Sequence, residues 1–188
     1  DTLIVDYSTA TTAVTSYVYG AGLNYSVKDS TTGVNGAAEN FKVTSGSGND
    51  QLLGDIGNDT LSSGAGNDTV NGGYGGVDAL DGGTGSDRWF GYLEHLSAGI
   101  TATLDSNISL YNGTTAKNFE SFSLKLGDGN DNIITLANGL QDDVTGGKGD
   151  DTFTAVMDGG GDTFDGGLGN DTLIVDYSTA TTAVTSYV

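Results

Sequence analysis

Ten aspartates recur along this chain in two arrays, with nine to eleven residues between successive members of an array. They are Asp50, Asp59, Asp68, Asp78, Asp87, Asp131, Asp142, Asp151, Asp162 and Asp171. Two positions after each stands an apolar residue: Leu52, Leu61, Val70, Leu80, Trp89, Ile133, Val144, Phe153, Phe164 and Leu173. Because the chain is only 36% hydrophobic, chance does not account for ten matches in ten. This spacing limits the fold more than any other feature of the sequence.

The residues around each aspartate follow the form G-G-x-G-x-D-x-U-x, where U is a large apolar residue. Glycines give the backbone access to positive φ and let carbonyl groups converge. The x-U-x triplet is typical of a short strand whose central side chain points inward. One nonapeptide then forms one turn and one strand, and two form a full coil. Stacked at the strand spacing of ~4.8 Å, such coils predict an all-β fold, a right-handed parallel β-roll or β-solenoid.

The charge of the chain is unusual in kind as well as in size. Its formal net charge is -19, and only three of its 25 acidic residues are Glu. A disordered acidic chain has no reason to place short carboxylates at fixed positions in glycine turns. A hard cation with oxygen ligands requires such an arrangement. We therefore expect Ca²⁺ in the turns, between each turn and the turn two motifs later.

The motif resembles the RTX, or haemolysin-type, calcium-binding repeats of secreted bacterial proteins. GGTGSDRWF, GGKGDDTFT and GGLGNDTLI match it fully, and the resemblance covers about half of the residues. It implies roughly six Ca²⁺ ions, held by the carboxylates and turn carbonyls of neighbouring loops. The implied pairs are Asp50 with Asp68, Asp59 with Asp78, Asp68 with Asp87, Asp131 with Asp151, Asp142 with Asp162, and Asp151 with Asp171. The implied turn glycines are Gly46, Gly48, Gly57, Gly64, Gly66, Gly73, Gly75, Gly82, Gly85, Gly127, Gly129, Gly146, Gly149, Gly166 and Gly169.

Two of these sites depart from the pattern. The segment GGYGGVDALD around Asp78 carries an extra residue, and ANGLQDDVT around Asp142 lacks most of its glycines. We expect the sites of Asp78 and Asp142 to be the least regular.

The arrays span residues 45–90 and 126–174, and two irregular β inserts interrupt the roll at residues 1–44 and 91–125. Alternating polar and apolar residues in LNYSV (23–27) and ITATL (100–104) indicate half-buried strands in both inserts. The inserts resemble each other, so the chain reads as two halves, and we expect the inserts to continue the stack as irregular coils or side hairpins.

Residues 1–18 and 171–188 are identical, DTLIVDYSTATTAVTSYV, at a distance of 170 residues. Asp1 lacks the glycine turn that precedes Asp171. The identity indicates a tandem array in which residues 175–188 begin the next copy. We expect adjacent copies to join head to tail, covalently or in a filament, since open strand edges at both ends invite association.

The sequence argues against an enzyme. His95 is the only histidine, and the chain has no cysteine and no G-x-S-x-G motif. The adjacent carboxylates of Asp142–Asp143 and Asp150–Asp151 belong to the calcium motif. The negative charge argues against nucleic acid and anionic membrane surfaces, and no apolar run approaches the ~20 residues of a membrane span.

We therefore expect a calcium-rigidified structural repeat of an extracellular bacterial protein, such as an adhesin stalk, a surface layer or a filament. The resemblance implies export by type I secretion and folding outside the cell. One alternative is the carboxy-terminal folding and secretion module of a secreted toxin or hydrolase. Another is a ligand-binding or glycan-binding adhesin domain, for which Tyr17, Tyr19, Tyr25 and Tyr92 are candidates. Trp89 occupies an inward position, which favours core packing.

Overall fold

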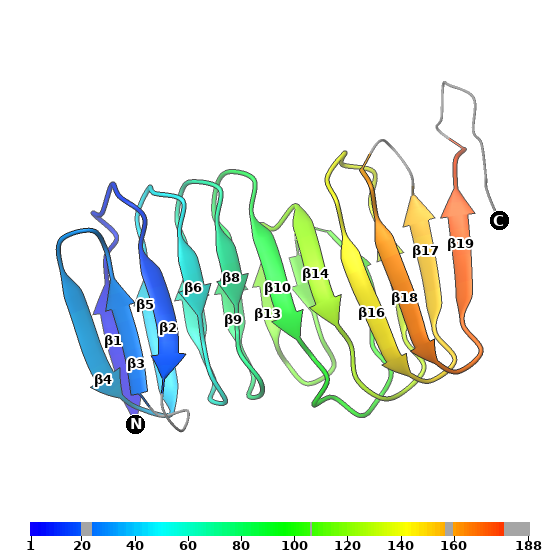
Figure 1. Cartoon of the computed structure of the whole chain (residues 1–188), viewed down its shortest axis with the longest axis horizontal. Coiled ribbons are helices and arrows are strands. Elements are labelled where there is room, and N and C mark those ends of the chain that lie inside the picture. The colour runs from blue at the N-terminus through cyan, green and yellow to red at the C-terminus, as the bar shows by residue number, and fades with distance from the viewer. Residues whose placement is uncertain (20–23, 106, 157–159, 179–188) are drawn as a thin grey trace.

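A computed structural model describes residues 1–19, 24–105, 107–156 and 160–178 of the chain. These residues form 19 β-strands and no helix, and the strands lie side by side along the long axis of the molecule (Figure 1). The predicted all-β fold is confirmed. Within the same ranges, there is accordingly no helix of the length and apolarity that crossing a bilayer requires.

The strands belong to three sheets. In spatial order, the nine-stranded sheet contains β18 (Thr163–Leu168), β16 (Asp143–Lys148), β14 (Ser121–Lys125), β10 (Arg88–Tyr92), β8 (Thr69–Asn71), β6 (Gln51–Leu53), β2 (Thr15–Tyr19), β3 (Asn24–Lys28) and β4 (Gly33–Ala37). The six-stranded sheet contains β1 (Thr2–Asp6), β5 (Asn40–Thr44), β7 (Thr60–Ser62), β9 (Ala79–Asp81), β13 (Thr115–Lys117) and β12 (Asn107–Ser109). The four-stranded sheet contains β11 (Thr101–Leu104), β15 (Asn132–Thr135), β17 (Thr152–Val156) and β19 (Thr172–Asp176).

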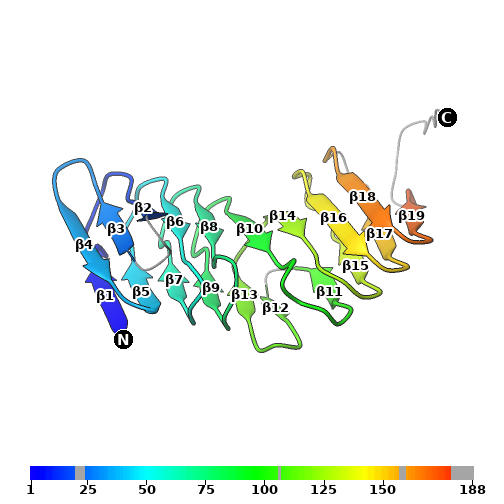
Figure 2. The same cartoon turned by 60° about the horizontal axis from the view of Figure 1, so that its bottom comes forward.

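Within the arrays, each strand pairs in parallel with the strand two motifs later. β6 pairs with β8, β7 with β9, and β16 with β18. Successive strands therefore alternate between two faces, and Figure 2 brings the second face, with β5, β7 and β9, into view. The predicted arrangement of one strand per motif and two motifs per coil is confirmed.

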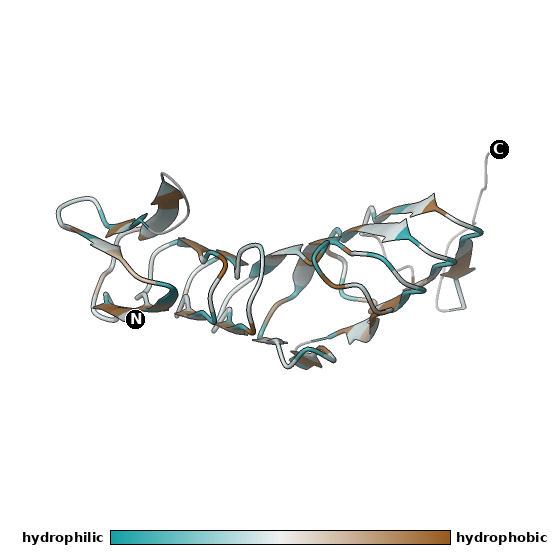
Figure 3. Cartoon of the chain, turned by 90° about the horizontal axis from the view of Figure 1, so that it is seen from below, coloured by the Kyte–Doolittle hydropathy of each residue, from teal (hydrophilic) through white to brown (hydrophobic). Residues whose placement is uncertain are grey.

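The core is a narrow row of side chains between the two faces. The apolar residues two positions after the aspartates point into it, because successive side chains of a strand point to opposite sides. Eight of the ten are buried: Leu52, Leu61, Val70, Leu80, Trp89, Ile133, Val144 and Phe153. Phe164 and Leu173 lie in the last coil and are less buried. Figure 3 shows the two layers and the alternation of apolar and polar residues along the strands.

The residues outside the two arrays add strands to the same sheets. β1 and β5 pair in parallel, as do β10 and β14 and β11 and β15. Two antiparallel units also occur, β2–β3–β4 and β12–β13. The division of the chain at residues 44/45, 90/91 and 125/126 stays a prediction, because the sheets run across these positions. Most of the predicted start of the next copy, residues 179–188, lies outside the described residues.

Three aromatic or titratable side chains considered above have clear positions. Trp89 is 1% exposed and packs against Phe119 and Phe122, with ring centroids 6.5 Å away in each case. Tyr25 is also buried and stacks on Phe41, so it is no part of an exposed binding face. His95 is exposed.

Candidate metal centre

The sixth-position aspartates form ladders along the turns. In all six predicted pairs, the backbone N–H of the first aspartate donates to Oδ1 of the second, at 2.7–3.0 Å. The partners are 18 to 20 residues apart, so each hydrogen bond joins one coil to the next. The structure therefore places the two aspartates of every predicted pair on adjacent coils, including the pairs that contain Asp78 and Asp142. Whether these groups ligate a metal stays a prediction.

The ladders extend beyond the motif residues at several ends. The N–H groups of Val14, Phe41, Ile100 and Phe122 donate to Asp50, Asp59, Asp131 and Asp142. The N–H of Asp78 donates to the hydroxyl of Thr114, and that of Asp87 donates to the carboxylate of Glu120. The motif pattern did not identify Thr114 and Glu120. Their separations from Asp78 and Asp87 are 36 and 33 residues, so the regular spacing gave no signal for them.

The second carboxylate oxygens are the distinctive feature of these turns. Six of the described aspartates have an Oδ2 atom that is buried and accepts no hydrogen bond. Five of them are predicted ligands, and the sixth is Asp55: Asp50, Asp55, Asp68, Asp87, Asp131 and Asp151. Asp55 replaces the second glycine of its motif and was not among the predicted ligands. A buried carboxylate oxygen without a partner is costly, and this cost recurs in both arrays. Such oxygens are available to a cation.

The first glycine of a motif allows the carboxylate of the sixth-position aspartate in the same motif to lie against the backbone. A Cβ on Gly146 would lie 2.1 Å from Oδ2 of Asp151 and 2.6 Å from the carbonyl oxygen of Gly166 in the next coil. A Cβ on Gly54 would meet Asp59 Oδ2 and the Gly72 carbonyl oxygen in the same way, each at 2.3 Å. A carboxylate and a carbonyl of two neighbouring coils thus converge on one point.

The other predicted glycines surround the same turns. Gly66 (φ 137°) and Gly149 (φ 141°) have positive φ, and a Cβ on either would lie 2.1 Å from the carbonyl oxygen of the equivalent glycine in the preceding coil. Positive φ or a close backbone or carboxylate approach also holds for Gly46, Gly48, Gly57, Gly64, Gly73, Gly82, Gly85, Gly127, Gly129, Gly166 and Gly169. Gly75 differs, because its nearest neighbour would be the Ile56 carbonyl oxygen at 3.3 Å.

Burial raises the pKa of the ladder carboxyls. The pKa is raised to about 6 for Asp59 and Asp131, and to about 7 for Asp78, Asp87 and Asp142. Loss of hydration is the largest cause in each case, and a neighbouring carboxylate adds to it. Without a cation, the folded state therefore resists the ionisation of these groups.

The donors fit Ca²⁺. They are carboxylate and carbonyl oxygens, the ligands that this cation prefers, and several of them are buried without a partner. Among the described residues no group of three or more His, Cys, Asp or Glu side chains has metal-binding geometry. A Ca²⁺ site here would therefore be built from one or two carboxylates of adjacent coils together with turn carbonyls, and this ligand set stays a prediction.

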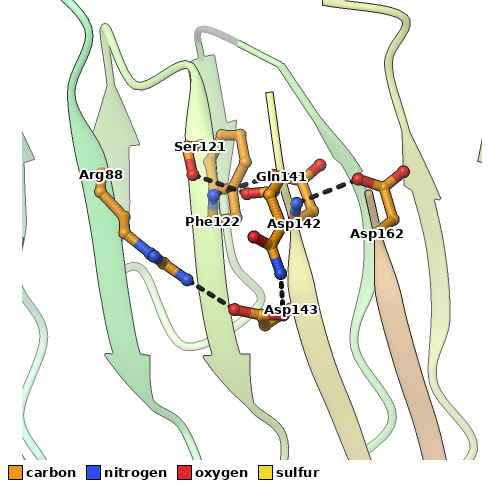
Figure 4. Close-up of polar contacts among 7 residues, drawn as sticks. All are labelled: Arg88, Ser121, Phe122, Gln141, Asp142, Asp143 and Asp162. Carbon is orange, nitrogen blue, oxygen red and sulfur yellow. Dashed lines mark hydrogen bonds and ion pairs between the residues drawn. The ribbon is translucent and has the colours of Figure 1, made fainter. Parts of the chain in front are cut away.

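The turn before Asp142 has a different composition, yet the carboxylate keeps its place in the ladder (Figure 4). Asp142 accepts from the Phe122 N–H at 2.9 Å, and its own N–H donates to Asp162 at 3.0 Å. Arg88 binds the adjacent Asp143 at 2.7 Å. The positive charge of Arg88 lowers the pKa of Asp142 against the larger effect of burial. The guanidinium group of Arg88 thus supplies a positive charge near the turn that has the fewest glycines.

We expect the metal-free protein to lose β-structure as pH rises from about 4 to about 7. The folded-state pKa of the ladder carboxyls is raised above the unfolded value of 3.8, so the folded state binds more protons in this window and stability falls with rising pH. The affinity for calcium should instead increase with rising pH, because protons compete with calcium for the same carboxylate oxygens. Far-UV circular dichroism at about pH 5 and pH 7.5, with and without calcium, measures both slopes. A metal-free signal that grows with pH would contradict the assignment.

Gly146→Ala is expected to raise the calcium concentration needed for folding by about tenfold, since an added Cβ displaces the Asp151 carboxylate from its position. Gly161→Ala is the matched control, because nothing lies within 4 Å of its added Cβ and its φ is not positive. Calcium titration followed by circular dichroism compares the two variants. Equal midpoints would show that the close approach at Gly146 has no bearing on the metal.

Comparison with known protein families identifies the RTX calcium-binding nonapeptide repeat in this chain, in four copies over residues 44–75 and 136–173. No curated protein and no solved structure matches the chain. The resemblance seen in the motif is thereby confirmed: the chain carries repeats of a kind that binds Ca²⁺ and is typically structural. Asp78, Asp87 and Asp131 lie outside the matched residues, and the hydrogen-bonded ladders connect them to the aspartates within.

Proposed function

We propose that this chain of RTX repeats is a structural unit of an extracellular bacterial protein, which folds into a stiff right-handed β-roll when it binds Ca²⁺ outside the cell. RTX repeats are typical of secreted bacterial proteins. The proposed setting is a stalk, a surface layer or a filament, in which copies follow one another head to tail. Export in the unfolded state by type I secretion, at low cytosolic calcium, belongs to the same proposal.

The observation that supports this proposal best is the row of buried carboxylate oxygens without hydrogen-bond partners in both arrays. The side chains of Asp50, Asp68 and Asp87 hold one such row, and those of Asp131 and Asp151 hold another. Bound Ca²⁺ would supply the positive charge that these oxygens lack and would link adjacent coils. Six pairs of aspartates give roughly six sites.

The chain's own residues account for the dependence on metal. The core is one narrow row of side chains, and the 32 glycines lose much conformational freedom on folding. The net charge of -19 adds repulsion between the coils. A ligand that binds only the folded state stabilises it by ~2.7 kcal/mol per site at a hundredfold excess over Kd. The free energy of binding summed over roughly six such sites exceeds the free energy of unfolding of a typical small domain, which is about 5–15 kcal/mol.

Removal of calcium is therefore expected to unfold the chain. Far-UV circular dichroism should lose the β-signal on addition of a chelator at pH 7.5 and regain it when calcium is restored in excess, whereas Mg²⁺ at the same concentration should restore little, because it keeps its waters and demands stricter geometry. A chain that stays fully ordered after exhaustive chelation would refute the proposed function.

A second candidate function, glycan binding, is favoured by one feature of the surface. A groove of about 470 Å³ lies over β2, β6, β8 and β10 and is lined by Tyr17, Tyr74, Phe90 and Tyr92, among others. Tyr74 is 58% exposed and stacks on Tyr92. The ammonium groups of Lys28 and Lys125 lie 5.4 Å from the ring centroids of Tyr17 and Tyr92. Exposed aromatic faces with nearby polar groups are suited to sugar rings.

Binding of the calcium-loaded protein to an array of bacterial and host glycans tests this second function. Tyr74→Ala should weaken any specific binding. Tyr111→Ala, which alters a tyrosine of similar exposure outside the groove, should leave the binding unchanged. Equal binding by both variants, or no binding by the parent chain, would remove the groove as a glycan site.

A further inference from the structure

The same strand occurs twice in this chain with opposite edges paired. β1 and β19 share the sequence TLIVD, and each lies at the end of its sheet, at opposite ends of the molecule (Figure 1). β1 pairs with the later strand β5, and β19 pairs with the earlier strand β17. One copy therefore shows how this strand binds the coil that follows, and the other shows how it binds the coil that precedes.

The backbone groups involved are complementary. On the preceding side, the N–H of Thr172 donates to the carbonyl oxygen of Asp151 at 2.8 Å. On the following side, the carbonyl oxygen of Asp1 accepts from the N–H of Asn40 at 3.1 Å, and the N–H of Tyr7 donates to Thr44 at 2.7 Å. Donors alternate in direction along a parallel strand, so both sets of bonds can be made by one strand at the same time.

The described part of the chain contains such a strand with both edges paired at the start of its second half. β10 follows Asp87 as β1 follows Asp1, and it pairs on one edge with β8 and on the other with β14. The N–H of Arg88 donates to the Asp68 carbonyl at 2.8 Å, and the Asp87 carbonyl accepts from Ser121 at 3.1 Å. These are the bonds that Thr172 makes in β19 and that Asp1 makes with Asn40.

The acidic residue beside this strand is also repeated. The N–H of Asp87 donates to the Glu120 carboxylate at 2.9 Å, and the amino group of Asp1 binds the Glu39 carboxylate. Glu39 and Glu120 thus take the place of an aspartate at the start of a new half. An equivalent of Glu39 is the partner that Asp171 would meet in a following copy.

Burial gives a second, independent indication. Val5 is 5% exposed where β5 and its coil follow, whereas the identical Val175 is 43% exposed at the other end. Leu3 is half-buried and Leu173 is 55% exposed. The last coil thus displays the apolar side chains that the next coil covers in the first copy.

We propose that β19 binds residues 40–44 of a second copy of this repeat, in the register of β1 with β5, from Thr172 opposite Asn40 to Asp176 opposite Thr44. A strand of sequence TLIVD then serves both as the last strand of one unit and as the first strand of the next. We call this contact between two copies the joint. β18 of one copy and β4 of the next, which are the two ends of the nine-stranded sheet, would also pair at the joint, as β9 and β13 do within the chain. The joint rests on the proposed function in one respect, which is that the coils must be folded with calcium.

Because β1 already covers this edge of β5, two separate chains cannot form the joint unless one gives up its β1. In one continuous polypeptide, β19 itself stands in the place of β1. The test therefore compares the present chain with a tandem chain in which residues 1–170 precede residues 1–188. Tyr7→Phe in the middle copy of the shared strand marks its peptides for mass spectrometry.

Amide hydrogen exchange in calcium should slow at least about tenfold at the equivalents of Val175 and Tyr177 in the middle strand of the tandem chain. The amide of Thr172 is the internal control, since it is already bonded to Asp151, and its exchange should be the same in both proteins. Unchanged exchange at Val175 and Tyr177 in a folded tandem chain would overturn the joint and leave the proposed function standing. A tandem chain that fails to fold where the single unit folds would also overturn it. Loss of calcium-dependent folding in the single unit would instead refute the proposed function.

Discussion

The double variant Asp68→Asn, Asp151→Asn is expected to shift stability in opposite directions with and without calcium. Each asparagine keeps an Oδ1 that can accept the N–H of the preceding aspartate, so the ladders remain. Each loses the buried Oδ2 that has no hydrogen-bond partner. Asp68 and Asp151 together belong to four of the six predicted pairs. In calcium, we expect the midpoint of folding to rise by at least about tenfold in calcium concentration, from the loss of ligand charge.

Without calcium, the same variant should retain more β-structure than the parent chain at pH 7.5. Burial raises the pKa of both Asp68 and Asp151, so the metal-free fold is penalised for ionising them, and asparagine removes this penalty. Circular dichroism against calcium concentration measures both effects. A variant that is weaker in calcium and also weaker without it would show that the carboxylates have a structural role unconnected with metal.

Asp6→Asn, Asp105→Asn is the matched control, with the same change in net charge. Both residues lie outside the arrays, and each accepts a backbone N–H two residues further on, from Ser8 and Asn107. Asparagine can accept the same bonds. We expect little change of the calcium midpoint, and a shift as large as that of the ladder variant would assign the effect to overall charge.

The arrays could be predicted from the sequence because each physical requirement leaves a mark at a fixed spacing. Leu52 and Leu61 face the core because the strand period is two. Asp50 stacks on Asp68 because two motifs complete a coil. Gly146 is glycine because a carboxylate and a carbonyl lie where its Cβ would be. In each case one residue type satisfies a local constraint that every coil repeats.

The remaining features depend on contacts between segments of different sequence. The hairpin of β12 and β13 places Thr114 at the end of one ladder, and Glu120 lies at the end of another, directly before β14. No spacing rule connects these two residues to Asp78 and Asp87. Tyr74 lies in the turn with the extra residue and reaches Tyr92 in another coil. Such contacts arise where the repeat is broken, so periodicity carries no information about them.

Trp89→Ala is expected to lower the free energy of unfolding by about 3–5 kcal/mol at saturating calcium. Trp89 is the largest fully buried side chain, and it fills the core where the two halves meet, against Phe119 and Phe122. In a thick core, neighbouring layers can move into a cavity. Here the core is one row of side chains between two hydrogen-bonded faces, so little can move to fill the space.

Phe90→Ala is the control for this prediction, because Phe90 follows Trp89 in β10 and points to the opposite side, where it contacts Tyr92. We expect a loss of at most about 1.5 kcal/mol from this outer aromatic contact. Urea unfolding at saturating calcium, followed by circular dichroism, compares the two variants. If Trp89→Ala cost no more than Phe90→Ala, the turns alone would hold the coils together, and the row of apolar residues would have only a minor part in stability. If the loss is large, the metal sites and the core act jointly: the calcium midpoint of Trp89→Ala should then rise as well, since the ions bind only to the folded coil that the core helps to form.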